Sequence, residues 1–432
     1  MGVLKIFSAS VLLRVMRLLL NVLIIGSLGR YLGEQGTGSL LSALAVVTVL
    51  LCVAELGLAR ISVREQVAQP EERAAIRGSI FRLRLMAGLV LFGTVVLGGF
   101  GLAKQDRTLL WIYALLLPTH AFAELGGALE ADHQVLKNQW AQWWGFLIGA
   151  LITLGGVLMQ MPLIFFPCAF LAECWITSFR QWLAFRRSTD TFGFWRWDKS
   201  RALTLLRESF PELASQLALV LLFRLDTLML KAMRGDADAG VYAAAVRLSE
   251  TLYFTPMLLA SVLMPRLVKA RQLGDGSYET GLVRYFAGSW LMGFGGAVCL
   301  VACAVPITQL LWGQKFAGSA DILFIHAWAF IPYALGVART QHLTIEGRLW
   351  ANLPSVLLAL LTNIVLNWLW IPAYGGAGAA WATLVSYSLA WVATSFLLPP
   401  LHASGRLQIL GVKHLPVLPR EVCSALFKTH PV

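Results

Sequence analysis

The chain has 432 residues, of which 58% are hydrophobic and only 13% are charged, with a mean hydropathy of +0.69. Soluble domains are roughly half apolar and a quarter charged, so this apolar surplus excludes a water-soluble globular protein. The formal net charge of +12 would suggest a nucleic-acid partner in a soluble protein, but the distribution of the charge described below excludes that class here.

Apolar segments of about 20 residues follow one another along the chain, each long enough to cross roughly 30 Å of hydrocarbon as a helix. They span residues 7–30, 39–60, 85–103, 108–129, 143–160, 162–183, 211–231, 240–264, 285–305, 319–338, 350–371 and 377–400. The alternation of a membrane β-barrel is absent from them. We therefore predict an all-α polytopic membrane protein with about 12 transmembrane helices.

The first segment is predicted to remain in the mature protein. Arg14 and Arg17 interrupt its apolar run, and no small-residue cleavage site of a signal peptide follows it.

The basic residues are distributed asymmetrically between the two sides of the predicted membrane. Of the Lys and Arg residues in the connections or near the segment ends, 25 lie on the side of the N-terminus and six lie on the other side. Cytoplasmic loops carry such an excess, and it lies beside an anionic leaflet. We predict a bacterial inner-membrane protein with both termini cytoplasmic, membrane lipids as neighbours and no nucleic-acid partner.

The longest cytoplasmic connection divides the twelve segments into six and six. We predict an N-terminal six-helix bundle (1–185), a basic cytoplasmic linker (186–210), a C-terminal six-helix bundle (211–400) and a cytoplasmic tail (401–432). GEQGTGSL (33–40) and GDADAGVY (235–242) each read glycine, acid, three residues, glycine, and each is typical of a compact turn before a helix. The two halves could thus form a parallel repeat about an axis along the membrane normal.

A polar stripe marks the first segment. Arg14, Arg17 and Asn21 follow the i, i+3, i+7 spacing that places them on one helix face. Arginine keeps its charge and offers a planar fork that suits a phosphate, so one interpretation is a site for a phosphorylated ligand. The other is that these side chains reach the cytoplasmic headgroups, and both interpretations stay open at this point.

Charges also interrupt the seventh and eighth segments. In an antiparallel helix pair Asp226 and Arg247 lie at about the same depth, which predicts an ion pair. Arg224 lies about 200° around the helix from Asp226 and must face Glu250 or a wet cavity instead.

Buried carboxylates are candidates for coupling transport to an ion, because burial raises their affinity for a proton. We assign Glu55, Glu173, Asp226 and Glu250 to this group and rank Glu124 below them, near the cytoplasmic end. The alternative is that these acids only pair with arginines or bond neighbouring helices.

Catalytic signatures are absent from the sequence. There is no GxxxxGK[ST], HExxH, GxSxG or paired CxxC pattern, so we expect neither an enzyme nor a cofactor or metal site.

Three stretches together resemble bacterial polysaccharide-transport flippases. LGRYLGEQGTGSL and the following ELGL turn lie within Leu28–Glu65, FRLDTLMLKAMRGDADAGVYAAAVRLSE is Phe223–Glu250, and WIPAYGGAGAAWATLVSY is Trp370–Tyr387. The resemblance implies the multidrug/oligosaccharidyl-lipid/polysaccharide exporter superfamily, with two six-helix bundles around a central V-shaped cavity and alternating access. It also implies an undecaprenyl-pyrophosphate-linked oligosaccharide repeat unit as cargo, for O-antigen or related surface polysaccharide.

In such proteins basic residues lining the cavity receive the cargo, so Arg14, Arg17, Asn21, Arg224 and Arg247 are this chain's candidates for substrate binding. Coupling to H⁺ or Na⁺ is a hypothesis that depends on the buried acids. The alternatives are a drug or metabolite exporter of the same fold and, in another class, a membrane polysaccharide polymerase or glycosyltransferase. The polymerase and the transferase would each need a large extramembrane loop or domain, which the sequence does not contain.

Overall fold

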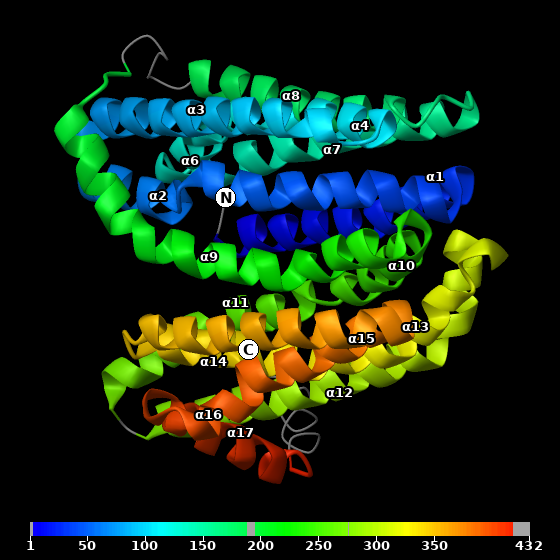
Figure 1. The fold of residues 1–432 in the computed structure, drawn as a ribbon. Coiled ribbons are helices and arrows are strands. Elements are labelled where there is room, and N and C mark those ends of the chain that lie inside the picture. Colours follow the sequence, from blue (N-terminus) through cyan, green and yellow to red (C-terminus); the bar gives the residue numbers. More distant parts are fainter. Residues whose placement is uncertain (1–2, 188–194, 275, 418–432) are drawn as a thin grey trace. The chain divides into compact units, whose positions relative to one another are not determined.

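The computed structural model describes residues 3–187, 195–274 and 276–417, with side chains described from residue 12 onward. All regular structure in this part of the chain is helical (Figure 1). The α-helices are α1 (Val3–Glu55), α2 (Leu58–Ala68), α3 (Arg73–Gly98), α4 (Lys104–Ala114), α5 (Leu116–Thr119), α6 (Glu124–Ala131), α7 (Val135–Leu158), α8 (Phe165–Arg186), α9 (Lys199–Arg234), α10 (Asp236–Thr251), α11 (Phe254–Leu273), α12 (Ser277–Trp312), α13 (Gly318–His326), α14 (Phe330–Ile345), α15 (Asn352–Ser388), α16 (Thr394–Leu397) and α17 (His402–His414).

Short helical turns connect several of these helices. Seven of the labelled turns are 3₁₀ helices, namely η1 (Pro70–Glu72), η2 (Gly99–Gly101), η3 (His120–Ala123), η5 (Gln314–Phe316), η6 (Ala327–Ala329), η7 (Leu349–Ala351) and η9 (Pro399–Leu401). The turn η8 (Leu389–Ala393) is a π-helix.

The prediction of an all-α polytopic membrane protein is confirmed. Within the described ranges, nine helical stretches are long and apolar enough to cross a membrane. The two longest, Leu12–Ala68 and Leu349–Leu397, each cover most or all of two of the twelve predicted segments. The sixth segment corresponds to α8, which is helical but less apolar than the nine.

Helices α1 and α15 each consist of two helical segments, and a glycine separates the two segments in each helix. Gly33 in α1 has φ 68° and ψ −176°, and Gly375 in α15 has φ 56° and ψ −133°. Only glycine adopts such angles without strain, so the chain can leave one helix and start the next within a single residue. The turn predicted from GEQGTGSL is therefore present at Gly33.

The chain forms two compact units, residues 1–240 and 241–432. In the first unit α7 packs along α8, and α1 contacts α4, α7 and α9. Its main apolar core joins α1, α3, α4, α5 and α8 through residues such as Val47, Leu109 and Phe166. The sequence-based division groups α9 with the second bundle, whereas here α9 belongs with the first unit. The predicted bundle boundaries stay a prediction.

The second unit is organised around α12. This helix packs against α11, α13, α14 and α17, and α13 packs against α15. Tyr285 and Phe286 of α12, Leu335 of α14 and Leu407 of α17 form a common buried core. The first part of the predicted tail is therefore a helix packed on α12, while residues 418–432 lie outside the described residues.

The predicted linker is also largely structured. Arg196 donates a backbone hydrogen bond to Ala74 of α3, and α9 begins at Lys199, twelve residues before the predicted start of its segment. Asp198 caps α9, because the Ser200 hydroxyl and the Arg201 backbone N–H both donate to its Oδ1. These bonds hold the pKa of the Asp198 carboxyl below its usual value. Residues 188–194 of the linker lie outside the described part of the chain.

A tight turn joins α1 to α2 and fixes the position of α9. Leu56 and Gly57 both have left-handed backbone angles, with φ 57° and 67°. A Cβ added to Gly57 would lie 2.6 Å from Leu213 N and 2.7 Å from Ser209 O, both on α9. The ELGL turn thus needs glycine for two reasons, its own backbone angles and the close approach of α9.

We predict that Gly57→Ala destabilises the folded protein by about 1–3 kcal/mol, because the new Cβ combines backbone strain with overlap on α9. A thermal-unfolding assay in detergent should show a lower midpoint and less monodisperse protein. Gly93→Ala is the matched control, because a Cβ at Gly93 would meet nothing within 4 Å. Equal behaviour of the two variants would contradict the proposed packing of the turn on α9.

Candidate functional site

A polar cavity of about 430 Å³ lies inside the first compact unit. Its wall is built from α1, α2, α3, α6, α7, α8 and the short α5 and η3 turns. The polar lining consists of Arg17, Glu55, Ser62, Arg84, Thr119, His120, Glu124, Glu130, Asn138, Gln142, Glu173, Thr177, Ser178 and Gln181. Such a gathering of charges among membrane-spanning helices is costly and marks a functional site by default.

One ion pair at the cavity wall joins α1 to α8. Arg17 donates to Glu173 Oε1 at 3.0 Å, and its guanidinium lies 5.1 Å from the centre of the Phe146 ring. The Arg17 side chain is 42% exposed and that of Glu173 is 16% exposed. Arg17 is therefore paired but still reachable by a ligand.

A second pair is completely enclosed. Arg84 donates to Glu124 Oε2 at 3.2 Å, and their side chains are 3% and 0% exposed. The Glu124 carboxylate also accepts from Ser62 at 2.7 Å and from Gln66 at 2.9 Å. Arg84 further approaches Glu55 at 4.0 Å, so it lies between two carboxylates. Because Glu124 is so fully bonded, its first role is to hold Arg84 in place.

The hydrogen-bond network continues from this pair to the end of the bundle. Gln66 accepts from Arg77 Nε at 2.6 Å, and Arg77 donates to both oxygens of Asp132 at 2.9 and 3.0 Å. Arg73 pairs with the same carboxylate at 3.3 Å. Helices α2, α3 and α6 are thus joined by bonds between buried polar side chains.

Some polar atoms at the cavity remain available. Arg84 Nε and His120 Nε2 are buried without a hydrogen-bond partner. Asn138 accepts from Gln181 at 2.8 Å and from Gln142 at 3.3 Å, which adds a group of amides to the wall. Guanidinium and amide donors suit phosphate and sugar oxygens, while the carboxylates can take up protons. Across the described residues no three His, Cys, Asp or Glu side chains are grouped to hold a metal ion.

The structure brings together three of the predicted site residues, Arg17, Glu55 and Glu173. Arg14 is exposed and Asn21 is half-buried on the same helix, and neither lines the cavity. Arg17 of this stripe is bound to Glu173, which the sequence analysis assigned to the buried acids.

The other four predicted residues lie on α9 and α10. Asp226 is buried and Arg224 half-buried on α9 of the first unit. Arg247 and Glu250 are half-buried on α10, within the second unit. The ion pair of Asp226 with Arg247 and the roles of all four stay predictions.

Sequence reasoning missed the buried arginines. Arg77, Arg84 and Arg339 were assigned to cytoplasmic connections, yet Arg77 and Arg339 are 0% exposed and Arg84 is 2% exposed. Glu124, which was ranked last among the acids, is the partner of Arg84. Helix α3 starts at Arg73, well before the apolar run, so Arg77 and Arg84 lie seven residues apart on one face of a helix. That spacing was the available signal.

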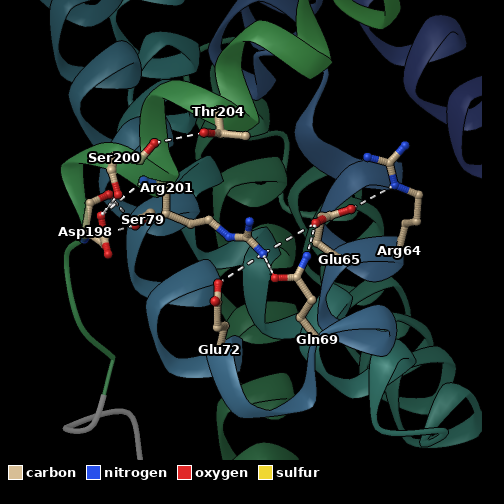
Figure 2. A network of polar contacts seen from close by, with 9 residues as sticks. All are labelled: Arg64, Glu65, Gln69, Glu72, Ser79, Asp198, Ser200, Arg201 and Thr204. Carbon is tan, nitrogen blue, oxygen red and sulfur yellow. Dashed lines mark hydrogen bonds and ion pairs between the residues drawn. The ribbon is translucent and has the colours of Figure 1, made fainter.

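A separate polar network joins α2 and η1 to the first turns of α9 (Figure 2). Arg201 pairs with Glu72 at 3.1 Å and with Glu65 at 3.5 Å, and it donates to Gln69. Arg64 pairs with Glu65 at 3.0 Å and also with Glu208 of α9. The side chains of Arg64 and Glu72 are exposed, so the pairs that they make contribute roughly 0–1 kcal/mol each, whereas Arg201 and Glu65 are mostly buried.

The fold and the charged interior define a multi-pass helical membrane protein. The structure superposes on the lipid II flippase MurJ in an inward closed conformation with a TM-score of 0.73, covering 96% of this chain and 92% of that chain at 12% identity. It superposes on an inward-facing multidrug resistance MATE family transporter of the MOP superfamily with a TM-score of 0.71, covering 93% and 96% at 12% identity.

Residues 3–271, more than half of the chain, match the family model described as polysaccharide biosynthesis protein, and the chain belongs to this family. The family predicted from Leu28–Glu65 and Phe223–Glu250 is thereby confirmed, whereas Trp370–Tyr387 lies outside the matched range. The multidrug resistance protein NorM of Vibrio vulnificus is 26% identical over 250 residues, 53% of this chain and 52% of NorM. The chain thus spans about half the length of the curated relatives it matches.

We predict that Arg84→Met lowers stability by about 3–5 kcal/mol, because it leaves the enclosed Glu124 carboxylate without its charged partner. Adding Glu124→Gln should recover a large part of the loss, since the remaining group is neutral and still bonds Ser62 and Gln66. Thermal unfolding of the two single variants and the double variant in detergent measures this coupling. Additive losses would show that the two side chains do not form a pair.

Proposed function

We propose that this protein is a flippase that moves an undecaprenyl-pyrophosphate-linked oligosaccharide repeat unit from the cytoplasmic to the periplasmic leaflet of the bacterial inner membrane, for surface polysaccharide synthesis. Membership of the polysaccharide biosynthesis family supports the cargo class. The observation that carries the proposal is a polar cavity with two guanidinium groups inside a bundle of membrane-spanning helices.

The cargo explains why such a cavity is needed. A pyrophosphate and sugar hydroxyls that enter hydrocarbon lose their water, at a cost of roughly several kcal/mol for each unsatisfied polar group. Guanidinium, amide and hydroxyl groups of the protein replace that water, while the prenyl chain stays in lipid. Alternating access then exposes the polar part of the cargo to the opposite side.

The Arg17–Glu173 pair supplies a way to couple cargo to protons. The ion pair of Arg17 with Glu173 can be released by protonation of Glu173 or by an anion that competes for the guanidinium. A cargo phosphate binding Arg17 would displace Glu173, which would then take up a proton. Release of the phosphate on the other side would return Arg17 to Glu173 and expel the proton there, so one H⁺ moves in the same direction as the cargo and a gradient that is more acidic on the loading side assists transport. In this scheme H⁺ is the coupling ion, with Glu55 as a second site for it beside Arg84.

The remaining predicted residues keep their proposed roles. Arg14, Asn21, Arg224 and Arg247 are proposed to contact the cargo, and Asp226 and Glu250 to take part in ion coupling. Both termini are proposed to be cytoplasmic.

A drug exporter of the same fold is the second candidate, favoured by the likeness to the multidrug resistance protein NorM. An exporter of cationic drugs would need acids free to bind its substrate. Here Glu173 and Glu124 are each bound to an arginine, whereas Glu130 of the same lining accepts a hydrogen bond from the Asn138 amide, so the acids alone do not decide between the two cargoes.

Deletion of the gene tests the function directly. Cells without the protein should lose surface polysaccharide and accumulate lipid-linked repeat units that remain accessible only from the cytoplasmic face. Complementation with the intact gene should restore both properties. Normal polysaccharide together with altered drug sensitivity would support the exporter instead.

We predict that Arg17→Gln reduces transport by at least tenfold, because the cargo phosphate loses a charged partner worth about 1.5–3 kcal/mol. Glu173→Gln should retain cargo binding but lose the dependence of transport on a proton gradient. Both effects can be measured as flipping of a lipid-linked oligosaccharide in proteoliposomes with and without an imposed pH gradient. Arg60→Gln is the control, because Arg60 is exposed on α2 away from the cavity. Full coupling in Glu173→Gln would remove Glu173 from the scheme.

A further inference from the structure

Three amides and one carboxylate form a connected group on the wall of the polar cavity. The Asn138 amide nitrogen donates to Glu130 Oε1 at 2.8 Å. Asn138 Oδ1 in turn accepts from the amide nitrogens of Gln181 at 2.8 Å and Gln142 at 3.3 Å. The four side chains come from α6, α7 and α8, and all of them line the cavity. None of the four takes part in the two arginine ion pairs of the same cavity.

The Glu130 carboxylate fixes the direction in which each amide points. A carboxylate accepts hydrogen bonds and does not donate them, so Asn138 must turn its nitrogen toward Glu130 and its oxygen toward the two glutamines. The glutamines must then offer their nitrogens to that oxygen, and their own oxygens point away from Asn138. Neither glutamine oxygen is bonded within the described residues, and neither is fully buried, so both can be reached from the cavity.

This end of the cavity therefore presents hydrogen-bond acceptors together with a few donors. The acceptors are the two glutamine oxygens and Glu130 Oε2, because Asn138 is the one partner of Glu130 among the described residues. Each glutamine nitrogen uses one hydrogen on Asn138 and keeps a second.

A sugar hydroxyl fits this arrangement better than other polar groups do. A hydroxyl both donates and accepts, so it can bond an amide oxygen and an amide N–H at the same time. An ionised phosphate only accepts, and the Glu130 carboxylate repels it. An ammonium group only donates, so it would leave the amide hydrogens unpaired.

Helix α8 sets the distance between this group and the guanidinium of Arg17. Glu173, Thr177 and Gln181 follow the i, i+4, i+8 spacing of one helix face, and all three line the cavity. At a rise of about 1.5 Å per residue, Gln181 lies about 12 Å along the helix axis from Glu173, which bonds Arg17. A pyrophosphate held at Arg17 and the first sugar attached to it can extend over that distance.

A glycine of α6 makes room for the amides. A Cβ added to Gly126 would lie 2.9 Å from Gln181 Nε2 and 3.2 Å from Asn138 Oδ1. A Cβ on the next residue, Gly127, would make only ordinary contacts, the nearest with Ser62 Oγ at 3.6 Å. Residue 126 must therefore lack a side chain if the amides are to pack against α6, whereas residue 127 can carry a methyl group.

We propose that Glu130, Gln142 and Gln181 form a sugar-binding subsite that receives the hydroxyl groups of the first, pyrophosphate-linked sugar of the cargo. The inference rests on the proposed function, since it assumes that Arg17 binds the cargo phosphate. Asn138 is a positioning residue, because it is buried and orients the two glutamines. The subsite also implies a specificity. An ionised Glu130 disfavours a sugar that carries its own carboxylate, so the first sugar is neutral.

The first test separates the sugar from the pyrophosphate. Titration calorimetry on the full-length protein in detergent measures binding of undecaprenyl pyrophosphate, either bare or carrying one hexose. The wild type should bind the hexose-bearing lipid more tightly. Gln142→Met should weaken binding of that lipid by about twofold to tenfold, as expected for one lost hydrogen bond, and should leave binding of the bare lipid unchanged. Gln139→Met is the matched control, because Gln139 lies on the same helix but outside the cavity lining.

The outcomes distinguish the subsite from the proposed function. Equal binding of the two lipids by the wild type would overturn the subsite alone. Equal weakening of both lipids by Gln142→Met would also overturn it, because a purely structural amide network does not discriminate between them. Arg17→Gln should weaken binding of both lipids. Wild-type protein that binds neither lipid would contradict the proposed function and the subsite with it.

A second test moves the amides without replacing them. Gly126→Ala should reduce the preference for the hexose-bearing lipid, because the new methyl group displaces Gln181 and Asn138, and Gly127→Ala should keep that preference. Equal preference in the two variants would contradict the subsite. The result for Gln142→Met does not depend on the folding of Gly126→Ala.

A third test addresses the specificity. The wild type should bind the lipid with a hexose more tightly than the same lipid with a hexuronic acid. Glu130→Gln should reduce this preference, because it removes the negative charge and keeps an oxygen that accepts from Asn138. An unchanged preference in Glu130→Gln would show that Glu130 does not face the sugar and would overturn the subsite as proposed.

Discussion

Two ion pairs between guanidinium and carboxylate groups determine how the first unit can be built. A single charged side chain at the centre of a membrane helix costs roughly 2.5–3.5 kcal/mol, so Arg17 and Arg84 require partners on other helices. Glu173 of α8 and Glu124 of α6 provide them, and the helices carrying these acids must therefore lie around α1 and α3. The cavity is the space left between the two pairs. The same charges thus stabilise the bundle and give it a polar interior.

The two pairs differ in what they leave accessible. Glu124 is fully enclosed and takes bonds from Ser62, Gln66 and Arg84, so exchanging any of its partners would leave a buried group unsatisfied. Arg17 is half-exposed and has Glu173 as its charged partner and Phe146 as its ring contact. A passing anion can replace Glu173 without disturbing the network that holds α2, α3 and α6 together. In the proposed mechanism, stability and transport therefore depend on different arginines of one site.

Most of the architecture could be predicted from the sequence, because the membrane fixes helix length and forbids unpaired backbone groups. The two turns containing Gly33 and Gly235 were predictable from their pattern, and Glu173 was among the expected acids. The role of Arg84 could not be predicted, because its partner Glu124 is 40 residues away in the sequence. In addition, helix α3 extends beyond the apolar run from which its segment was predicted, so Arg84 was assigned to a connection. Helix α3 begins at Arg73 and α9 at Lys199, each inside a stretch that the sequence alone assigns to a loop.

The buried arginine of the second unit differs from those of the first unit in the groups that it bonds. Arg339 is 0% exposed, and it donates to neutral oxygens of Asn352, Thr394 and Ser395 at 3.0 to 3.2 Å. None of these acceptors titrates near neutral pH, so a proton gradient cannot switch the bonds that Arg339 makes. Arg17 differs because its acceptor, Glu173, can be protonated. In the proposed mechanism the pH-sensitive pairing therefore lies in the first unit, where protonation of Glu173 changes what the Arg17 guanidinium is free to bind.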